Sequence, residues 1–183
     1  LSSSFNPLSD VPVTVWWVAA LVAAIRPAVG SAAVAGMATS LAVLTRPNLA
    51  PLALLIALPF ASRWVSPSRA GRRGAELVVF LATASAGPLV VAALYNYWFD
   101  SPFTSGYGAT GLMFSPSHIL PNLARYPRWL IDTQTLLIVA GLATPVLLRG
   151  RRAAPDRLRP AAAAWLLFAL AALVWGSYLA YYF

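Results

Sequence analysis

Residues 76–99 read ELVVFLATASAGPLVVAALYNYWF, and this stretch decides the fold class. Its only charged residue is Glu76, at the very start. At a helical rise of about 1.5 Å per residue, the stretch is long enough to cross an apolar membrane core about 30 Å thick. Its apolar residues do not alternate with polar ones, as those of a membrane β-barrel strand would. The stretch therefore predicts a membrane-spanning helix that is interrupted at Gly87 and Pro88.

The rest of the chain has the same character. Of its 183 residues, 60% are hydrophobic and 10% are charged, whereas about 25% are charged in an average soluble domain. This composition excludes an ordinary soluble domain and is too apolar for a disordered chain. We expect an all-α, polytopic transmembrane helix bundle that forms a single domain over residues 1–183. It has about six spans, and the other five are residues 11–25, 28–45, 47–65, 130–148 and 161–183.

The arginines gather in two links between the predicted spans, residues 63–74 and 149–159. Because basic residues concentrate in cytoplasmic loops, both links and Arg26 are predicted to be cytoplasmic. The external parts are then residues 1–10, Arg46 and residues 100–129. With this orientation the net charge of +8 at pH 7 lies on the cytoplasmic side. The membrane explains this charge, so we expect no nucleic acid as a partner.

Residues 100–129 form the longest link, and their aromatic residues argue against disorder. We predict an external loop that contains a helix lying in the membrane interface. Arg125 and Arg128 would reach lipid headgroups, so membrane lipids are expected partners. Pro121 and Pro127 would limit the length of this helix. One of its faces would be lined by Ile119, Leu120, Leu123, Trp129 and Leu130.

Several kinds of chemistry are excluded by what the sequence lacks. The chain has no cysteine and one histidine, His118, so thiolate sites and sites of several histidines are excluded. We expect neither a metal nor a cofactor, and we interpret His118 as a polar residue of the external loop. No charged residue lies in the middle of a predicted span, which argues against a proton pump or an ion-coupled transporter. We therefore expect any chemistry at the external membrane surface.

Two charged residues at that surface have alternative interpretations. Asp10, two residues before Pro12, is either a helix N-cap or an acidic group that holds a substrate or an arginine, and these roles are compatible. Arg46 lies between two spans on the side where arginine is rare. It either extends to lipid headgroups or binds a lipid-borne phosphate with its guanidinium fork. We interpret Asp132 as a helix-end residue that faces headgroups.

Three stretches of the sequence together carry a family resemblance. They are residues 5–12 (FNPLSDVP), residues 44–48 (LTRPN) and residues 96–103 (NYWFDSPF), the last followed by Gly106-Tyr107-Gly108. In order and spacing they resemble the bacterial polytopic glycosyltransferases of the GT-C superfamily. The similar branch is that of the dolichyl-phosphate-mannose–protein mannosyltransferases, family 39. The resemblance covers most of residues 5–150.

The resemblance implies an integral-membrane enzyme that moves a sugar from a polyprenyl-phosphate donor to an acceptor at the external face of a bacterial inner membrane. It implies that the catalytic carboxylate lies upstream of Leu1, in an earlier external loop, and that the chain is an internal piece of a longer protein. Asp10 would be a supporting acidic residue. Relatives are expected to carry glycine where Asp100 stands. The implied substrate-binding residues are Arg46, Asn48, Asn96, Gly106, Tyr107 and Gly108.

The sequence leaves two other functions possible. A transporter or flippase-like protein for lipid-linked sugars would share an outward cavity and an arginine for phosphate. A purely structural membrane subunit would need neither Asp10 nor Arg46 for the activity of the full-length protein.

Overall fold

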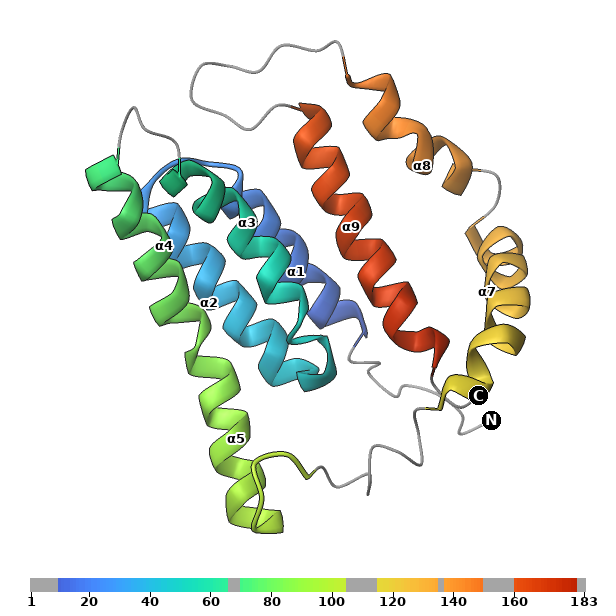
Figure 1. Cartoon of the computed structure of the whole chain (residues 1–183), viewed down its shortest axis with the longest axis horizontal. Coiled ribbons are helices and arrows are strands. Elements are labelled where there is room, and N and C mark those ends of the chain that lie inside the picture. The colour runs from blue at the N-terminus through green and yellow to red at the C-terminus, as the bar shows by residue number, and fades with distance from the viewer. Residues whose placement is uncertain (1–9, 66–69, 105–114, 135–136, 150–159, 181–183) are drawn as a thin grey trace, which may run out of the picture. The chain divides into compact units, whose positions relative to one another are not determined.

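The computed structural model describes residues 10–65, 70–104, 115–134, 137–149 and 160–180 (Figure 1). Over these residues the chain forms helices and turns and no strand, so the expected all-α class is confirmed for them. The contacts divide the chain into two compact units, Leu1–Val91 and Ala92–Phe183, and the boundary falls inside one helix.

The first unit consists of apolar helices joined by short links. Helix α1 (Asp10–Ala24) is followed by α2 (Val29–Thr45), and a 3-10 turn, η1 (Pro47–Leu49), leads from α2 towards α3 (Leu52–Val65). Helix α4 (Ala70–Ala84) and the beginning of α5 (Ala86–Phe99) complete the unit. Helix α1 packs against α2, while α4 packs against both α2 and α3.

Helix α2 approaches its neighbours closely because the residues on its buried side are small. A Cβ atom on Gly36 would collide with the side chain of Thr83 and would lie 2.7 Å from the carbonyl oxygen of Phe80. A Cβ atom on Gly87 would collide with the carbonyl oxygen of Ser40. Glycine is therefore required where α2 meets α4 and α5. The buried residues of α2 are Ala32, Ala35, Gly36, Ala38, Thr39, Ser40, Ala42 and Val43.

Helix α3 joins this core through aromatic stacking. The ring of Phe60 stacks on the ring of Phe80 in α4, with a distance of 5.0 Å between the ring centroids. Both side chains and that of Ile56 are fully buried. This contact holds α3 and α4 together in the second half of α3.

The second unit contains the end of α5, a 3-10 turn η3 (Pro116–His118), and helices α7 (Ile119–Gln134), α8 (Leu137–Leu147) and α9 (Pro160–Leu179). Helix α8 packs against α9, and α7 contacts both. Leu166 and Leu170, which lie about one turn apart on α9, are buried.

The predicted interruption near Gly87 and Pro88 falls at Ser85, between α4 and α5. Pro88 has no N–H to donate to the carbonyl of Ala84, and this accounts for the break. Helical hydrogen bonds continue around it, because the N–H of Leu89 donates to the carbonyl oxygen of Ser85 at 3.0 Å. Among the described residues, two helices are long and apolar enough to cross a membrane, Gly74–Phe99 and Pro160–Leu179.

One prediction about residues 119–134 is wrong. Pro127 does not end the predicted helix, because α7 continues through it to Gln134. The predicted span 130–148 overlaps the end of α7 and contains α8, and its residues 135–136 lie outside the described residues. A single proline removes one helical hydrogen bond, and α7 has further turns on either side that hold it together.

Candidate functional site

The first unit has two ends that differ in their charged residues. One end, which we call the Arg46 end, contains Asp10 at the start of α1, the end of α2 and the turn η1. The other end contains the last residues of α1 and α3 and Glu76 of α4. We call it the Arg63 end, because Arg63 forms hydrogen bonds there with Glu76 and with the carbonyl of Ala24. Helix α2 runs from one end to the other, and its 17 residues give a distance of about 26 Å between them.

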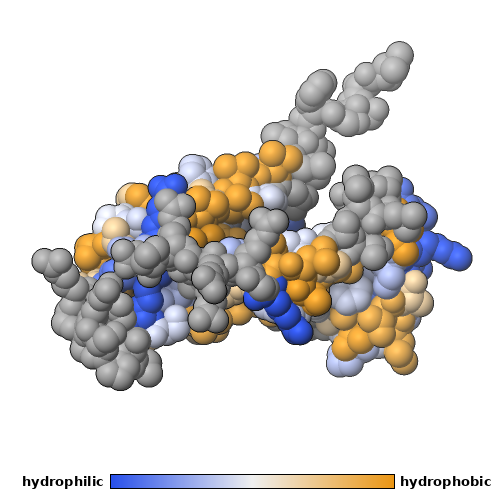
Figure 2. Space-filling view, turned by 90° about the horizontal axis from the view of Figure 1, so that it is seen from above, coloured by the Kyte–Doolittle hydropathy of each residue, from blue (hydrophilic) through white to orange (hydrophobic). Residues whose placement is uncertain are grey.

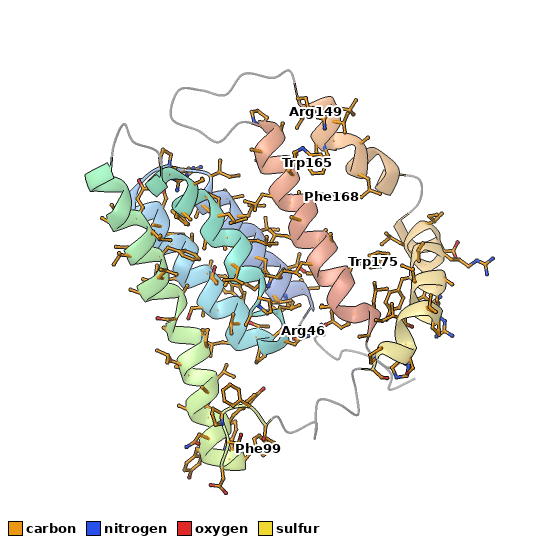
Figure 3. The ribbon with its side chains drawn as sticks, in the orientation of Figure 1. Arg46, Phe99, Arg149, Trp165, Phe168 and Trp175 are labelled. Carbon is orange, nitrogen blue, oxygen red and sulfur yellow. The ribbon has the colours of Figure 1, made fainter. Side chains whose placement is uncertain are left out.

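The backbone fixes Arg46 at the point where α2 stops. Its N–H closes the last helical turn by donating to the carbonyl oxygen of Ala42 at 2.9 Å, but its φ of −144° is that of an extended residue. Pro47 follows as the first residue of η1, where a missing N–H costs nothing. The side chain of Arg46 is half-buried and that of Asn48 is exposed. This half-buried cation at the end of two apolar helices is suited to bind an anion (Figure 3).

At the Arg63 end, the charges of Arg63 and Glu76 neutralise each other. The Nε atom of Arg63 donates to Oε2 of Glu76 at 3.1 Å, and its Nη1 atom donates to the carbonyl oxygen of Ala24 at 3.1 Å. The guanidinium also lies over the ring of Phe60, 4.8 Å from its centroid. Both charged side chains are largely buried, with 14% and 9% of their surface exposed. The cluster therefore joins α1, α3 and α4, and its role is structural.

In the second unit, polar groups around α7 satisfy the backbone at the end of α9. The last carbonyls of a helix lack partners within the helix. Asn122 donates from Nδ2 to the carbonyl oxygen of Leu179 at 2.9 Å, and the hydroxyl of Tyr126 donates to that of Tyr178 at 3.0 Å. The backbone N–H of Ser115 donates to the carbonyl oxygen of Ala180 at 2.8 Å. We call these three donors the α9 cap.

Burial raises the pKa of the Tyr126 phenol above its ordinary value of about 10. The positive charge of Arg125 opposes this rise, and the neighbouring phenol of Tyr178 adds to it. The ring of Tyr126 also lies 5.9 Å from that of Trp129, measured between centroids. The raised pKa extends to higher pH the range in which the phenol is neutral and donates to the carbonyl oxygen of Tyr178.

Asp100 has the only left-handed backbone conformation of a non-glycine residue among those described, with φ of 52°. It follows directly on α5, at the position where helices commonly end with glycine. This conformation gives a physical reason for the glycine that the family resemblance leads us to expect. Asp is one of the few other residues that adopt it.

The remaining predicted residues are distributed over both units. Asp10 begins α1, and its side chain lies outside the described residues, as do Gly106, Tyr107 and Gly108. Asn96 lies exposed on α5 in the second unit. Asp132 is exposed near the end of α7, and His118 is half-buried at the end of η3. The structure thus assigns Asp10, Arg46 and Asn48 to one end of one unit.

Sequence reasoning missed the α9 cap and the pairing of Arg63 with Glu76. The partners of Asn122 and Tyr126 are backbone carbonyls 57 and 52 residues away, which leave no trace in the sequence. The one signal available in the sequence was the spacing of Asn122 and Tyr126, because residues four apart lie on one face of a helix. Glu76 and Arg63 were visible as charges, and only the antiparallel packing of α3 and α4 reveals that they meet.

Within the described part of the chain, no group of three or more histidine, aspartate or glutamate side chains could hold a metal ion. Comparison with known proteins adds no assignment, because no family model, no curated protein and no solved structure matches the chain.

Proposed function

We propose that the chain is the membrane-embedded part of a glycosyltransferase that uses a polyprenyl-phosphate sugar at the external membrane surface. The observation that carries the proposal is the position of Arg46. It is a half-buried guanidinium at the end of α2, beside the turn η1 that leads to α3. The resemblance of residues 5–12, 44–48 and 96–103 to GT-C enzymes supplies the reaction.

Membrane embedding is supported by the surfaces of the helices. Large apolar side chains are exposed on both units, among them Leu54 of the first unit with 72% of its surface exposed and Leu147 of the second with 74%. Hydrophobic residues gather over much of the face seen in Figure 2. Exposed apolar surface of this extent is costly in water and favourable in lipid. The lengths of Gly74–Phe99 and Pro160–Leu179 support the same conclusion, and we propose that the shorter apolar helices complete about six spans.

An arginine at the Arg46 end matches the chemistry of a lipid-borne phosphate. The guanidinium forms two parallel hydrogen bonds with phosphate oxygens, and such charge-assisted bonds are stronger than neutral ones. The N-terminus of α3 lies at the same end and contributes a partial positive charge. The isoprenoid tail of the donor would then extend along the apolar helices into the lipid.

The reaction that we propose is a displacement at the anomeric carbon of the sugar. The bond between this carbon and the phosphate oxygen breaks, and a bond to the acceptor oxygen forms. The acceptor hydroxyl gives its proton to a carboxylate, and polyprenyl phosphate leaves. Arg46 would stabilise the charge of the leaving phosphate, and Asp10 would help to position the acceptor. The transfer itself balances without a metal ion or a redox cofactor.

Photolabelling of membranes tests the role of Arg46. The probe is a polyprenyl-phosphate mannose with a photoreactive group in its isoprenoid chain, and the protein is the full-length form. We expect Arg46→Gln to lower specific labelling by about 10- to 100-fold, because a hydrogen bond to a charged group contributes about 1.5–3 kcal/mol. Arg46→Lys should recover part of the labelling, since lysine keeps the charge but loses the fork.

Arg149→Gln is the matched control, because it removes the same charge from an exposed residue after α8. It should label like the wild type. Equal labelling of Arg46→Gln and wild-type protein would contradict the proposal. Labelling that depends on Arg46 without release of polyprenyl phosphate in the presence of acceptors would instead favour a transporter of lipid-linked sugars.

A further inference from the structure

The surface of α7 divides into three arcs, because successive residues of a helix are turned by about 100°. The first arc carries Asn122 and Tyr126, which are buried and cap α9. The second arc is apolar and exposed. It consists of Leu120, Leu123 and Ile131, with 78%, 44% and 49% of their surface exposed.

The third arc of α7 is charged and exposed, and it consists of Arg125, Arg128 and Asp132. Arg125 and Arg128 are three residues apart, so they are neighbours on the helix surface. Within the part of the chain that the structure describes, neither guanidinium forms an ion pair. Arg125 lies over the ring of Trp129, 5.7 Å from its centroid, and Trp129 is itself 45% exposed. The arc thus combines two cations with an aromatic ring of the kind found at membrane interfaces.

The apolar side expected from the sequence is wider than this arc. Ile119, Trp129 and Leu130, which were expected on it, are also exposed, with 38%, 45% and 36% of their surface exposed, and lie nearer to Asn122 and Tyr126 around the helix. Ile131 was not among the expected residues and lies beside Leu120 around the helix. The α9 cap decides the orientation, because Asn122 and Tyr126 must face the end of α9.

We propose that the apolar and charged arcs of α7 form a binding surface for anionic phospholipids. Leu120, Leu123 and Ile131 would enter the boundary between headgroups and acyl chains, while Arg125 and Arg128 bind lipid phosphates. Charge complementarity favours this occupant, because the charged arc has two cations and one anion. A second protein copy is disfavoured, since three aliphatic side chains supply far less than the about 800 Å² per partner of a stable interface.

The inference rests on the membrane embedding in the proposed function, but it does not depend on sugar transfer. It adds a lipid site to the second unit, about which the proposed role of Arg46 says nothing. The α9 cap gives the site its rigidity, because it fixes the rotation of α7 about its own axis. A helix that lay freely in the interface would lack this constraint.

Single spin labels test the inference in the full chain, because the chain contains no cysteine of its own. Leu120→Cys and Ile131→Cys place a nitroxide on the apolar arc, and Asp132→Cys places one on the charged arc as the matched control. Each variant is reconstituted in phosphatidylcholine bilayers with and without phosphatidylglycerol. Relaxation by oxygen and by a water-soluble nickel complex then gives the depth of each label.

We expect the labels at positions 120 and 131 to lie about 5–10 Å below the headgroup surface and the label at position 132 to lie shallower, at the level of the headgroups. The depth of the labels at positions 120 and 131 should increase when phosphatidylglycerol is present. The double variant with Arg125→Gln and Arg128→Gln should not show this increase. Labels at 120 and 131 that are as accessible to nickel as the label at 132 would overturn the inference. Labels shielded from both reagents would also overturn it, because they would indicate a protein partner.

Equal depths with and without phosphatidylglycerol would contradict the binding of anionic lipids. Alkaline extraction of the same vesicles separates this failure from failure of the proposed function. A chain that is extracted from the vesicles is not embedded, which contradicts the proposed function itself. A chain that stays in the vesicles while its labels on α7 face water contradicts only the lipid site.

Discussion

The two units join their helices in different ways. In the first unit, α2 meets α4 and α5 by close approach of small residues, and Gly36 and Gly87 leave no space for a side chain. In the second unit, α7 is held to α9 by side chains that donate to backbone carbonyls, namely Asn122 and Tyr126. The first arrangement depends on shape, and the second depends on hydrogen bonds.

The difference follows from the character of the helices. Helices α2 and α4–α5 are largely apolar, and in the membrane that we propose for them the hydrophobic effect would not bring apolar helices together. Close packing of small residues provides the attraction instead. The buried residues of α7 are Asn122 and Tyr126, and both have polar groups that donate to the backbone carbonyls at the end of α9. We therefore expect the first unit to respond most to added volume and the second to lost donors.

The buried ion pair of the first unit is an exception to this contrast, because it joins helices by charge and not by shape. Glu76→Ala leaves the guanidinium of Arg63 in a largely buried site without its carboxylate. We expect a loss of about 3–5 kcal/mol in the free energy of unfolding, measured by denaturant titration of the purified chain in detergent. Replacing both partners, as in Arg63→Met with Glu76→Leu, should cost much less. Wild-type stability of Glu76→Ala would show that the pair does not hold α1, α3 and α4 together.

Added volume at Gly36 tests the packing of α2 directly. The Cβ atom of Gly36→Ala would collide with Thr83 and the carbonyl of Phe80, so we expect a loss of about 1–3 kcal/mol in the same titration. Gly30→Ala in the same helix is the matched control, because nothing lies within 4 Å of its Cβ position. It should be neutral or slightly stabilising. If both variants lost the same stability, close approach would not explain the packing of α2.

Removal of one donor from the α9 cap should have the smallest effect. Tyr126→Phe keeps the ring and loses the hydrogen bond to the carbonyl of Tyr178, so we expect a loss of about 0.5–1.5 kcal/mol. Because the pKa of Tyr126 is raised in the fold, its contribution is complete below about pH 10 and falls as pH rises through the folded pKa. The wild type should therefore lose more stability than Tyr126→Phe between pH 8 and strongly alkaline pH. Parallel pH curves for the two proteins would contradict this account of the cap.

The sequence predicted the helices whose limits are set by local signals. Both ends of α1 and α2 and the start of α9 agree with the predicted apolar segments to within one residue, because loops with proline or arginine mark them. The start of α3 differs, since Pro47 opens a 3-10 turn and the α-helix begins only at Leu52. The continuation of α7 through Pro127 was not predicted, because a proline inside a helix and one at its boundary look alike in sequence.

The candidate site was predictable only in part. Arg46 was singled out because a cation between two apolar segments is unusual on the side where arginine is rare, and that reasoning needs no tertiary structure. The grouping of Asp10, Arg46 and Asn48 at one end follows from the alternating directions of α1, α2 and α3. The bonds of Arg63, Asn122 and Tyr126 depend on how helices distant in sequence pack, and no local pattern encodes this.

Accessibility labelling tests most directly the central claim, that the Arg46 end faces the outside of the membrane and the Arg63 end the cytoplasm. Asn48→Cys and Arg26→Cys each introduce one exposed thiol, one at each end of the first unit. Intact cells are treated with a maleimide that does not cross membranes. We predict that Asn48→Cys is labelled in intact cells and that Arg26→Cys is labelled only after the membrane is opened. The reverse pattern, or labelling of both in intact cells, would contradict the account.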